Sequence, residues 1–277
     1  CAKDVGRNTY SVFSDDMRVQ VERRIRTERE LREALERGGE LRAWFQPIHD
    51  LTTNDVVGFE ALCRWVTPTR VVPPNEFITV AEDTGLITQV GAVMLDQACE
   101  AIAGARRTTG RDLFVSVNVS ARQLVDDSIV SIVAETLARH QLAGEALCLE
   151  ITESIMVNDQ NVERLRALCR LGVWLAVDDF GTGYSSLSYL RHMPVSKVKI
   201  DKSFVDDIAT GDPSIMLAIL SMAHSLALTC IAEGVERAEQ ADRMRVLGCD
   251  SAQGYLWAKP VPVDQLDSLL LTPVPAR

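Results

Sequence analysis

Polar side chains recur at the ends of apolar runs along this 277-residue sequence. They are Glu60, Asn118, Glu150, Asp178 with Asp179, Lys199, Glu233 and Gln253. The intervals after Asn118 are 32, 28, 21, 34 and 20 residues, which is the spacing of successive strand–helix units. Any one of these residues alone is explained as a cap at a strand-to-helix turn. At the carboxyl ends of barrel strands they would converge in one mouth, where five carboxylates repel each other and require a cation.

The types of these side chains indicate the class of cation. Carboxylates with one amide oxygen, and no His or Cys, suit Mg²⁺ or Mn²⁺ rather than Zn²⁺. Because Asp178 and Asp179 are adjacent, they can hold two ions close together, and two such ions activate a water and clamp a phosphodiester for in-line displacement. Lys199 would then orient that water or stabilise the charge on the phosphorus; the alternative is a surface lysine.

A glycine-bearing segment, Phe180–Ser186, follows the aspartate pair. Its two glycines and polar neighbours predict a flexible loop over the barrel mouth that gates the metal site. Glu153 lies three residues after Glu150. It either tethers this loop by hydrogen bonds or is an acidic residue in the first turn of a helix.

The elements that must position these residues are short strands alternating with helical stretches. Apolar, β-rich runs lie at 113–118, 146–151, 173–178, 196–200, 229–233 and 250–254, and a hairpin at 42–48 and 56–60 brings the strands to eight. Helical spacing lies at 75–84, 86–106, 126–139, 160–171, 214–227 and 236–247. This alternation predicts an α/β fold, a modified TIM (β/α)8 barrel with one antiparallel strand. A doubly wound open sheet is the alternative, but no G-x-G-x-x-G segment follows an early strand.

Composition narrows the class of protein. Apolar residues make up 47% and charged residues 25% of the chain, as in a globular protein. The net charge of −10 disfavours binding to the backbone of DNA or RNA. The seven cysteines are scattered and include no CxxC pair, so we expect buried thiols in a reducing cytoplasm. The uncharged run 213–232 is expected to be a core-packed helix leading into a strand rather than a membrane span.

The first forty residues differ from the rest. Residues 14–39 predict an amphipathic, densely charged helix that ends at a glycine pair. This helix is either a solvated linker or a device that couples an upstream domain to the barrel or pairs with its twin in a dimer. No signal peptide is visible, and the missing initiator methionine indicates a piece of a longer protein. We therefore divide the chain into residues 1–13, the helix at 14–39 and a barrel at 40–277.

Eight short motifs occur in order along the barrel. They are FQPI (45–48), EALCRW (60–65), SVNVSARQL (116–124), LEITES (149–154), DDFGTG (178–183), KID (199–201), EGVE (233–236) and QGY (253–255). This series resembles the EAL domains over about residues 40–272. The resemblance implies a bacterial cyclic di-GMP phosphodiesterase with a modified TIM barrel, which hydrolyses the cyclic dinucleotide to linear pGpG with two Mg²⁺ or Mn²⁺ ions. Cys63 stands where an aliphatic residue is usual and Phe45 where tyrosine is usual; neither is an implied ligand.

The resemblance also implies roles for individual residues. The first ion would be held by Glu60, Asn118, Glu150 and Asp178, and the second by Asp178, Asp179 and, as an alternative to its role as general base, Glu233. Lys199 and Glu233 would flank the attacking water and form the catalytic set with Glu60. The substrate would meet Gln46, Leu62, Arg64 and Gln253. Glu153 would hold the loop 181–186.

Residues 1–13 resemble the end of a GGDEF (diguanylate cyclase) domain, with a lipidated Cys1 as the alternative. The two resemblances together imply a GGDEF–EAL composite protein that forms a homodimer. Two other functions stay open. One is a catalytically silent cyclic di-GMP receptor that signals to a partner, and the other is a barrel phosphohydrolase for another substrate.

Overall fold

The computed structural model describes residues 15–126, 128–153, 155, 159–181, 190–210 and 213–271. The first half contains α1 (Asp15–Arg37), β1 (Leu41–Asp50), β2 (Val56–Val66), β3 (Val71–Val72), α2 (Pro74–Thr84), α3 (Ile87–Thr109), β4 (Phe114–Asn118), α4 (Ala121–Val125) and α5 (Ile129–His140). The second half contains η1 (Gly144–Ala146), β5 (Leu147–Thr152), α6 (Asp159–Arg170), β6 (Trp174–Phe180), β7 (Lys197–Ile200), α8 (Lys202–Thr210), α9 (Ser214–Ser225), β8 (Thr229–Ala232), α10 (Ala238–Leu247), β9 (Ser251–Ala252), β10 (Val261–Pro262), η3 (Val263–Gln265) and α11 (Leu266–Leu271).

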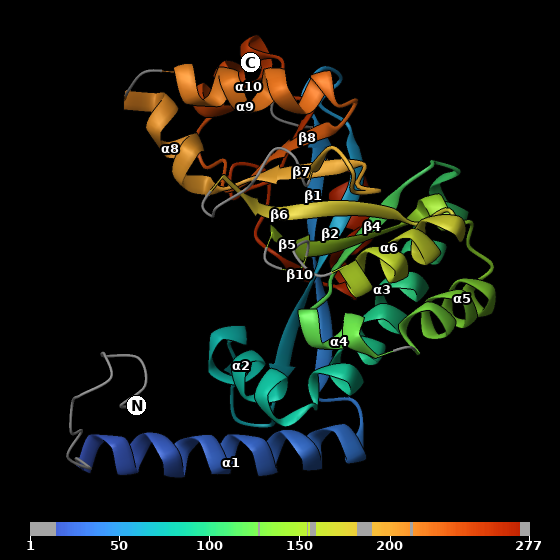
Figure 1. The fold of residues 1–277 in the computed structure, drawn as a ribbon, viewed down its shortest axis with the longest axis vertical. Coiled ribbons are helices and arrows are strands. Elements are labelled where there is room, and N and C mark those ends of the chain that lie inside the picture. The colour runs from blue at the N-terminus through green and yellow to red at the C-terminus, as the bar shows by residue number, and fades with distance from the viewer. Residues whose placement is uncertain are drawn as a thin grey trace.

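Eight of these strands close into a barrel (Figure 1), which confirms the predicted fold class. From β2 through β4, β5, β6, β7 and β8 to β9 every neighbouring pair is parallel. β1 closes the barrel by pairing antiparallel with β2 on one side and with β9 on the other. The short strands β10 and β3 extend the sheet beside β1 and β2. The parallel strands therefore all present their carboxyl ends at one mouth.

Alternation along the strands separates the barrel interior from its outer surface. Ile48, Phe114, Cys148, Ala176 and Ile231 form a small buried cluster of their own. Because side chains two residues apart share a face, Cys148, Ala176 and Ile231 lie one layer below Glu150, Asp178 and Glu233. The intervening residues, such as Val117 and Leu149, belong to the large core that packs under the helices. With both faces buried, each strand has the continuous apolar sequence typical of parallel sheets.

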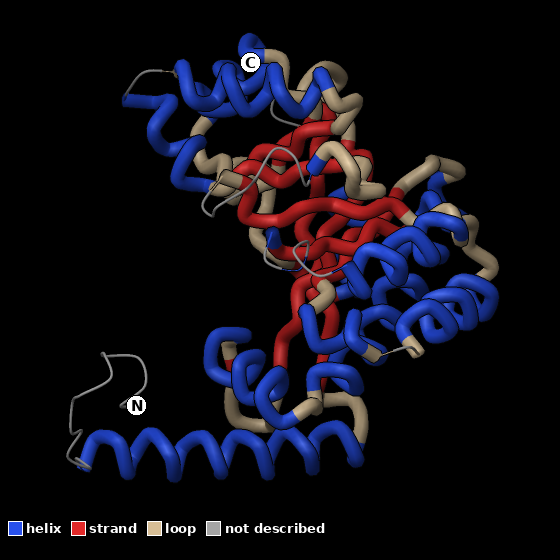
Figure 2. Tube along the Cα trace, in the orientation of Figure 1, coloured by secondary structure: helices blue, strands red, loops and turns tan. Residues whose placement is uncertain are grey.

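In Figure 2 the helices lie to the right of the red strands, above them and below them. In Figure 1, α3, α5 and α6 lie to the right of the barrel strands, and α8, α9 and α10 lie above them. α1 lies apart from the barrel and packs on α2. None of the described helices is long and apolar enough to cross a membrane. The run 213–232 forms α9 followed by β8, as expected.

Several predicted boundaries were wrong. β2 does not end near Glu60 but continues to Val66, because β1 and β3 supply hydrogen-bonding partners beyond the barrel. β9 contains two residues rather than five, so Gln253 follows the strand. α5 begins at Ile129 rather than at 126, since the short helix α4 occupies the preceding residues. The predicted helix at 14–39 corresponds to α1, whereas residues 1–13 lie outside the described part of the chain.

Candidate active site

The strand register brings the polar residues from the sequence analysis to one mouth. Asn118 lies opposite Glu150 in the β4–β5 pair, and the parallel pairing of β2 with β4 stops at Ala61, one residue after Glu60. Glu60 is therefore at the rim even though it lies in the middle of β2. Glu233 continues β8 by donating its backbone N–H to the carbonyl of Ile200 at 3.0 Å.

Lys199 lies at the centre of the cluster and is 1% exposed. Its Nζ lies 2.7 Å from Glu150 Oε2, 2.8 Å from Glu233 Oε1, 3.2 Å from Asp178 Oδ1 and 3.4 Å from Glu60 Oε1. A buried ammonium needs such partners to offset its lost hydration. The structure thus rejects the alternative of a surface lysine.

Two amides hold the Glu60 carboxylate from both sides. Asn118 Nδ2 donates to Glu60 Oε1 at 3.0 Å, and Gln253 Nε2 donates to Glu60 Oε2 at 2.6 Å. Gln253 Nε2 also lies 3.0 Å from Glu233 Oε1. Gln253 reaches this position because its backbone bonds both Ala232 and Val235. A side chain at Gly254 would overlap the backbone of Val235, so this close approach requires glycine.

Asp178 and Asp179 face the same site because β6 is irregular where they occur. Consecutive residues of a regular strand point to opposite faces. Here the β6–β7 register shifts between Val177 and Phe180, and Asp179 adopts a left-handed φ of 52°. Its backbone N–H donates to Asp178 Oδ1 at 3.0 Å. As a result, carboxylate oxygens of Asp178, Asp179 and Glu233 all lie within 4.8 Å of one another.

Burial and neighbouring charges shift the pKa values of the acids in different directions. Burial tends to raise the pKa of Glu60, but Lys199 and the amide hydrogen bonds outweigh it and the pKa is lowered. Burial and the charge of Glu60 hold the pKa of Glu150 well above its usual range. Burial also raises the pKa of Glu233 to about 7, despite the opposing effect of Lys199. Burial and the Asp178 charge raise the pKa of Asp179. Burial lowers the pKa of Lys199, but its acidic neighbours raise it well above the usual value.

Two buried oxygens of the cluster have no hydrogen-bond partner among the described residues. They are Glu150 Oε1 and Gln253 Oε1. Leaving a buried acceptor without a partner costs about 1–3 kcal/mol, so such atoms need an explanation. An oxygen-ligated cation supplies one, since both atoms belong to side chains that already surround the acids. The donor set, carboxylates with amide oxygens, fits Mg²⁺ or Mn²⁺.

A largely apolar cavity of about 270 Å³ opens beside Asn118. Its walls include Leu62 and Cys63 of β2, together with Pro74, Ile78 and Glu82 at α2. Arg64 follows on the same strand, is half-buried, and has its guanidinium 5.7 Å from the centre of the Trp44 ring. Gln46 pairs with Glu60 across β1 and β2 and donates to the Ala258 carbonyl at 3.1 Å. Of the predicted substrate-binding residues, Leu62 therefore lines a cavity with Asn118, and Gln46 lies opposite Glu60 in the β1–β2 pair.

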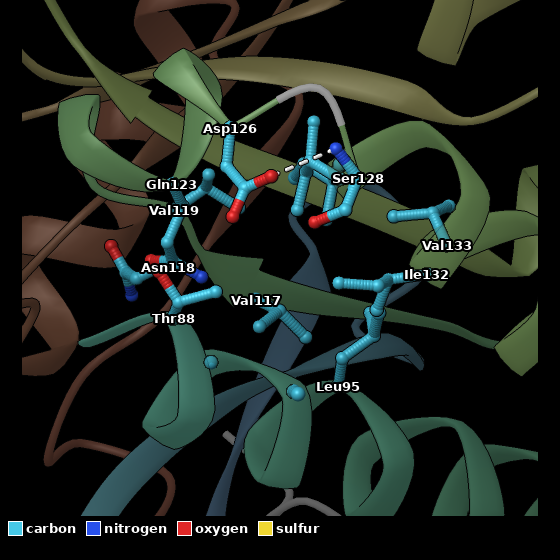
Figure 3. A pocket seen from close by; sticks show the side chains of 14 residues that line it. Thr88, Leu95, Val117, Asn118, Val119, Gln123, Asp126, Ser128, Ile132 and Val133 are labelled. Carbon is cyan, nitrogen blue, oxygen red and sulfur yellow. Dashed lines mark hydrogen bonds between the residues drawn. The ribbon is translucent and has the colours of Figure 1, made fainter. Parts of the chain in front are cut away.

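A second cavity, of about 20 Å³, lies behind Asn118 among α3, α4, α5 and β4 (Figure 3). Leu95, Ile132 and Val133 form much of its wall. Asp126 closes the α4–α5 connection by accepting a hydrogen bond from the Ser128 backbone at 2.9 Å. A void of this size holds about one water molecule, so it is a packing gap and not a substrate site.

Glu153 contacts the segment that follows the aspartate pair. Its Oε1 accepts a hydrogen bond from the Gly181 backbone at 2.9 Å. This contact fits the tethering interpretation for the first residue of the loop, while residues 182–186 lie outside the described part of the chain.

Two further groups of side chains near the site were not predicted from the sequence. Ser120 and Gln123 form a reciprocal capping box that starts α4 directly after the β4 strand end, and their S-x-x-Q spacing was a usable signal. Lys197, two residues before Lys199, lies one layer down with its Nζ 4.4 Å from the Trp174 ring and 4.9 Å from the Phe114 ring. No sequence signal distinguishes this half-buried lysine from an exposed one.

Comparison with known proteins shows the family. The family model described as EAL domain matches residues 28–260. The chain belongs to the EAL domain family. This EAL domain is 38% identical over 270 residues to the bifunctional diguanylate cyclase/cyclic di-GMP phosphodiesterase MucR of Pseudomonas aeruginosa, covering 96% of the chain and 39% of MucR. It is also 38% identical over 275 residues to the signaling protein YkoW of Bacillus subtilis, covering 98% of the chain and 34% of YkoW. The EAL domain thus spans little more than a third of each relative.

Solved structures show the same architecture. The PaMucR phosphodiesterase in its c-di-GMP complex superposes with a TM-score of 0.82 at 39% identity, covering 87% of this EAL domain and 99% of that chain. The EAL enzyme Bd1971, with cAMP and cyclic-di-GMP bound, gives a TM-score of 0.85 at 32% identity over 91% of this chain and 70% of that one. The fold of this EAL domain is therefore that of proteins solved with cyclic di-GMP.

Proposed function

We propose that this EAL domain hydrolyses one phosphodiester bond of cyclic di-GMP to give linear pGpG. The observation that carries the proposal is the buried cluster of Glu60, Glu150, Asp178 and Glu233 around Lys199. The Lys199 ammonium compensates only part of this negative charge. Divalent metal ions, which catalyse phosphodiester hydrolysis, would neutralise the rest. The likeness to the PaMucR phosphodiesterase, solved in its c-di-GMP complex, supports the choice of substrate.

The proposal assigns six residues to two divalent cations, Mg²⁺ or Mn²⁺. They are Glu60, Asn118, Glu150, Asp178, Asp179 and Glu233. When bound, such ions supply the Lewis acidity that lowers the pKa of a water and neutralises charge on the phosphodiester. The open acceptor on Glu150 and the convergence of Asp178, Asp179 and Glu233 support this assignment.

The remaining residues act on protons and on the substrate. Lys199 keeps its proton and places a fixed positive charge next to the reacting phosphate. Where it does not hold the second ion, Glu233, whose pKa is raised to about 7, accepts a proton near neutral pH. Arg64 meets a phosphate through its guanidinium fork. Gln46 and Leu62 hold a guanine beside the 270 Å³ cavity. Gln253 orients the carboxylates of Glu60 and Glu233 by donating a hydrogen bond to each.

The test is chromatographic. Purified protein is incubated with cyclic di-GMP in Mg²⁺, in Mn²⁺ and in chelator, and pGpG is quantified. Linear pGpG and a simple aryl diester are tested as substrates in separate reactions. We expect metal-dependent pGpG formation, with little turnover of the other two substrates. Glu60→Ala should abolish turnover while nucleotide binding persists, and Glu163→Ala, an exposed change on α6, should leave both unchanged.

Nucleotide binding without any product in the wild-type protein would contradict the proposal and indicate the silent-receptor function. Turnover of the aryl diester at the rate of cyclic di-GMP would point to a phosphohydrolase of another specificity.

We also propose that the domain acts as a homodimer within a longer GGDEF–EAL protein, with residues 1–13 ending the GGDEF-like part, 14–39 linking, and 40–277 forming the barrel. The share of MucR that the chain covers, 39%, leaves room for such a domain. Light scattering of the 277-residue chain should give twice its 30.6 kDa mass; a monomer at high micromolar concentration would contradict the dimer.

A further inference from the structure

A second group of metal-binding side chains lies outside the candidate active site. His224 is in the last turn of α9, Cys230 is the second residue of β8, and Asp250 directly precedes β9. Cys230 is three residues from Glu233, so its side chain lies on the outer face of the barrel, one to two residues from the strand's amino end. The group is thus at the end of the barrel opposite the mouth.

The three side chains already converge. One ligand atom from each, an imidazole nitrogen, the thiol sulfur and a carboxylate oxygen, lie within 4.8 Å of one another. Ligand atoms of a tetrahedral zinc site, with bonds of about 2.0–2.3 Å, are about 3.3–3.8 Å apart. The His224 side chain is 42% exposed, so its rotation can close the remaining distance while Asp250 stays in place.

Two hydrogen bonds with backbone N–H groups hold Asp250 in place. Its Oδ2 accepts a hydrogen bond from the Cys230 N–H at 2.8 Å, and its backbone carbonyl accepts one from Leu51 at 2.9 Å. His224 Nε2 lies 3.1 Å from the same Oδ2. A metal ion would replace this last contact and leave the two backbone bonds intact. The carboxylate is therefore oriented before any ion binds, which reduces the entropy lost on binding.

The chemistry of the ligands differs from that of the active site. Imidazole, thiolate and one carboxylate are the nitrogen, sulfur and oxygen donors of zinc sites, whereas Mg²⁺ and Mn²⁺ prefer oxygen alone. The charges of a thiolate and a carboxylate balance that of Zn²⁺. Burial, and then the charge of Asp250, raise the pKa of the Cys230 thiol to about 12, so binding must displace its proton.

We propose that His224, Cys230 and Asp250 form a Zn²⁺ site on the outer face of the barrel, with solvent as the fourth ligand. The ion joins α9 to β8 and to the start of β9. Glu233 and Gln253 lie three residues beyond Cys230 and Asp250, so the site secures the two strands that carry them. This zinc site does not depend on the proposed phosphodiesterase activity.

Cobalt provides a direct test, because a thiolate bound to Co²⁺ gives a charge-transfer band in the near ultraviolet and an all-oxygen site does not. Chelator-treated protein is titrated with Co²⁺ in a large excess of Mg²⁺, which occupies the oxygen-rich site, and then with Zn²⁺. We expect a band that saturates at one equivalent of Co²⁺ and disappears when Zn²⁺ is added. Zn²⁺ should also raise the melting temperature of the wild-type protein.

The variants identify the ligands. Cys230→Ser should remove the band, and His224→Gln should weaken Co²⁺ and Zn²⁺ binding by more than about tenfold, since losing even an outer partner of a ligand costs 10–100-fold. His224 is partly exposed, so His224→Gln tests the proposal even if Cys230→Ser fails to fold. Cys169→Ser, in a half-buried thiol on α6, is the matched control and should keep the band. Absence of the band in the wild type, or its survival in Cys230→Ser, would overturn the proposal and leave His224 and Asp250 as a side-chain contact between α9 and the residue before β9.

Discussion

At the scale of single residues, Lys199 decides the charge balance of the candidate site. Its ammonium lies within 3.4 Å of four acids and is sealed from water. Without bound metal, Lys199 is the cation that offsets repulsion among the converging carboxylates. It neutralises only one of their charges. Removing one partner of a buried ionic group typically costs about 3–5 kcal/mol, because the remaining charges stay buried and unpaired.

We therefore predict that Lys199→Met lowers the stability of the chelator-treated protein at pH 8 by about 3–5 kcal/mol. Mg²⁺ should restore more stability to this variant than to the wild type, since the ion then meets uncompensated acids. Turnover should fall by at least about 10²-fold, as for loss of a preorganised charge next to the reacting group. Lys259→Met, which removes an exposed lysine beside Tyr255, is the control for thermal unfolding and turnover. An unchanged melting temperature in Lys199→Met would mean that the acids are already protonated.

The pKa of Glu233, raised to about 7, makes metal binding pH-dependent. A raised carboxyl pKa means that the folded, metal-free protein holds a proton that the unfolded chain has lost above about pH 4.3. The contribution of protonated Glu233 to the free energy of unfolding of the metal-free protein is thus lost as pH rises from about 4.3 to about 7. A metal ligand must be deprotonated, so affinity has the opposite dependence.

We predict that Mn²⁺ affinity, measured by calorimetry, rises about tenfold per pH unit below pH 7 and levels off above it, as for displacement of one proton. Glu233→Gln should bind more weakly but flatten this pH dependence. A flat profile in the wild type between pH 5.5 and about 7 would show that Glu233 is ionised before the metal binds.

At the scale of elements, the sequence indicated which residues meet but not how each is aimed. Apolar runs spaced by helical stretches were enough to predict eight strands and the antiparallel β1, because that pattern depends on local composition. The adjacent aspartates could not be oriented in this way. A regular strand would point Asp179 away from the site, and only the shifted β6–β7 register and its positive φ turn it back. Likewise, the extension of β2 past Glu60 depends on pairing with β1 and β3, which are distant contacts.

The capping box of α4 makes two glycines of α3 differ in their effect. A methyl group at Gly91 would overlap the side-chain amide of Gln123, whereas one at Gly104 meets nothing within 4 Å. We predict that Gly91→Ala destabilises the protein by about 1–3 kcal/mol, because Gln123 must leave the cap. Gly104→Ala should stabilise it by about 0.5–1 kcal/mol through helix propensity.

Chemical denaturation of the two variants checks this pair, and cyclic di-GMP turnover provides a second measurement. Gly91→Ala should also reduce turnover, since the capping residue Ser120 lies two residues after Asn118. Equal stability changes for the two glycines would show that Gln123 moves aside without loss.

At the scale of the whole molecule, α1 is joined to the site through α2. Arg23 and Arg24 of α1 lie 2.8 Å and 2.6 Å from Glu76 and Asp83 of α2. These arginines are 67% and 53% exposed, and exposed ion pairs contribute about 0–1 kcal/mol each. Leu31, also on α1, is fully buried, and truncating such a leucine to alanine costs about 2–5 kcal/mol. Apolar packing, not the ion pairs, should therefore hold α1 on α2.

We predict that Leu31→Ala releases α1 and raises the KM for cyclic di-GMP more than it lowers kcat, because α2 forms a wall of the 270 Å³ cavity beside the site and carries no metal-ligand candidate. Hydrogen exchange should show faster exchange of α1 amides in this variant, with barrel strands unchanged. The double variant Arg23→Ala, Arg24→Ala is the matched control and should change both measurements little at physiological salt, since screening already weakens exposed pairs. If the double variant instead released α1 and Leu31→Ala did not, electrostatic contacts would hold the helix, and its attachment would depend on ionic strength.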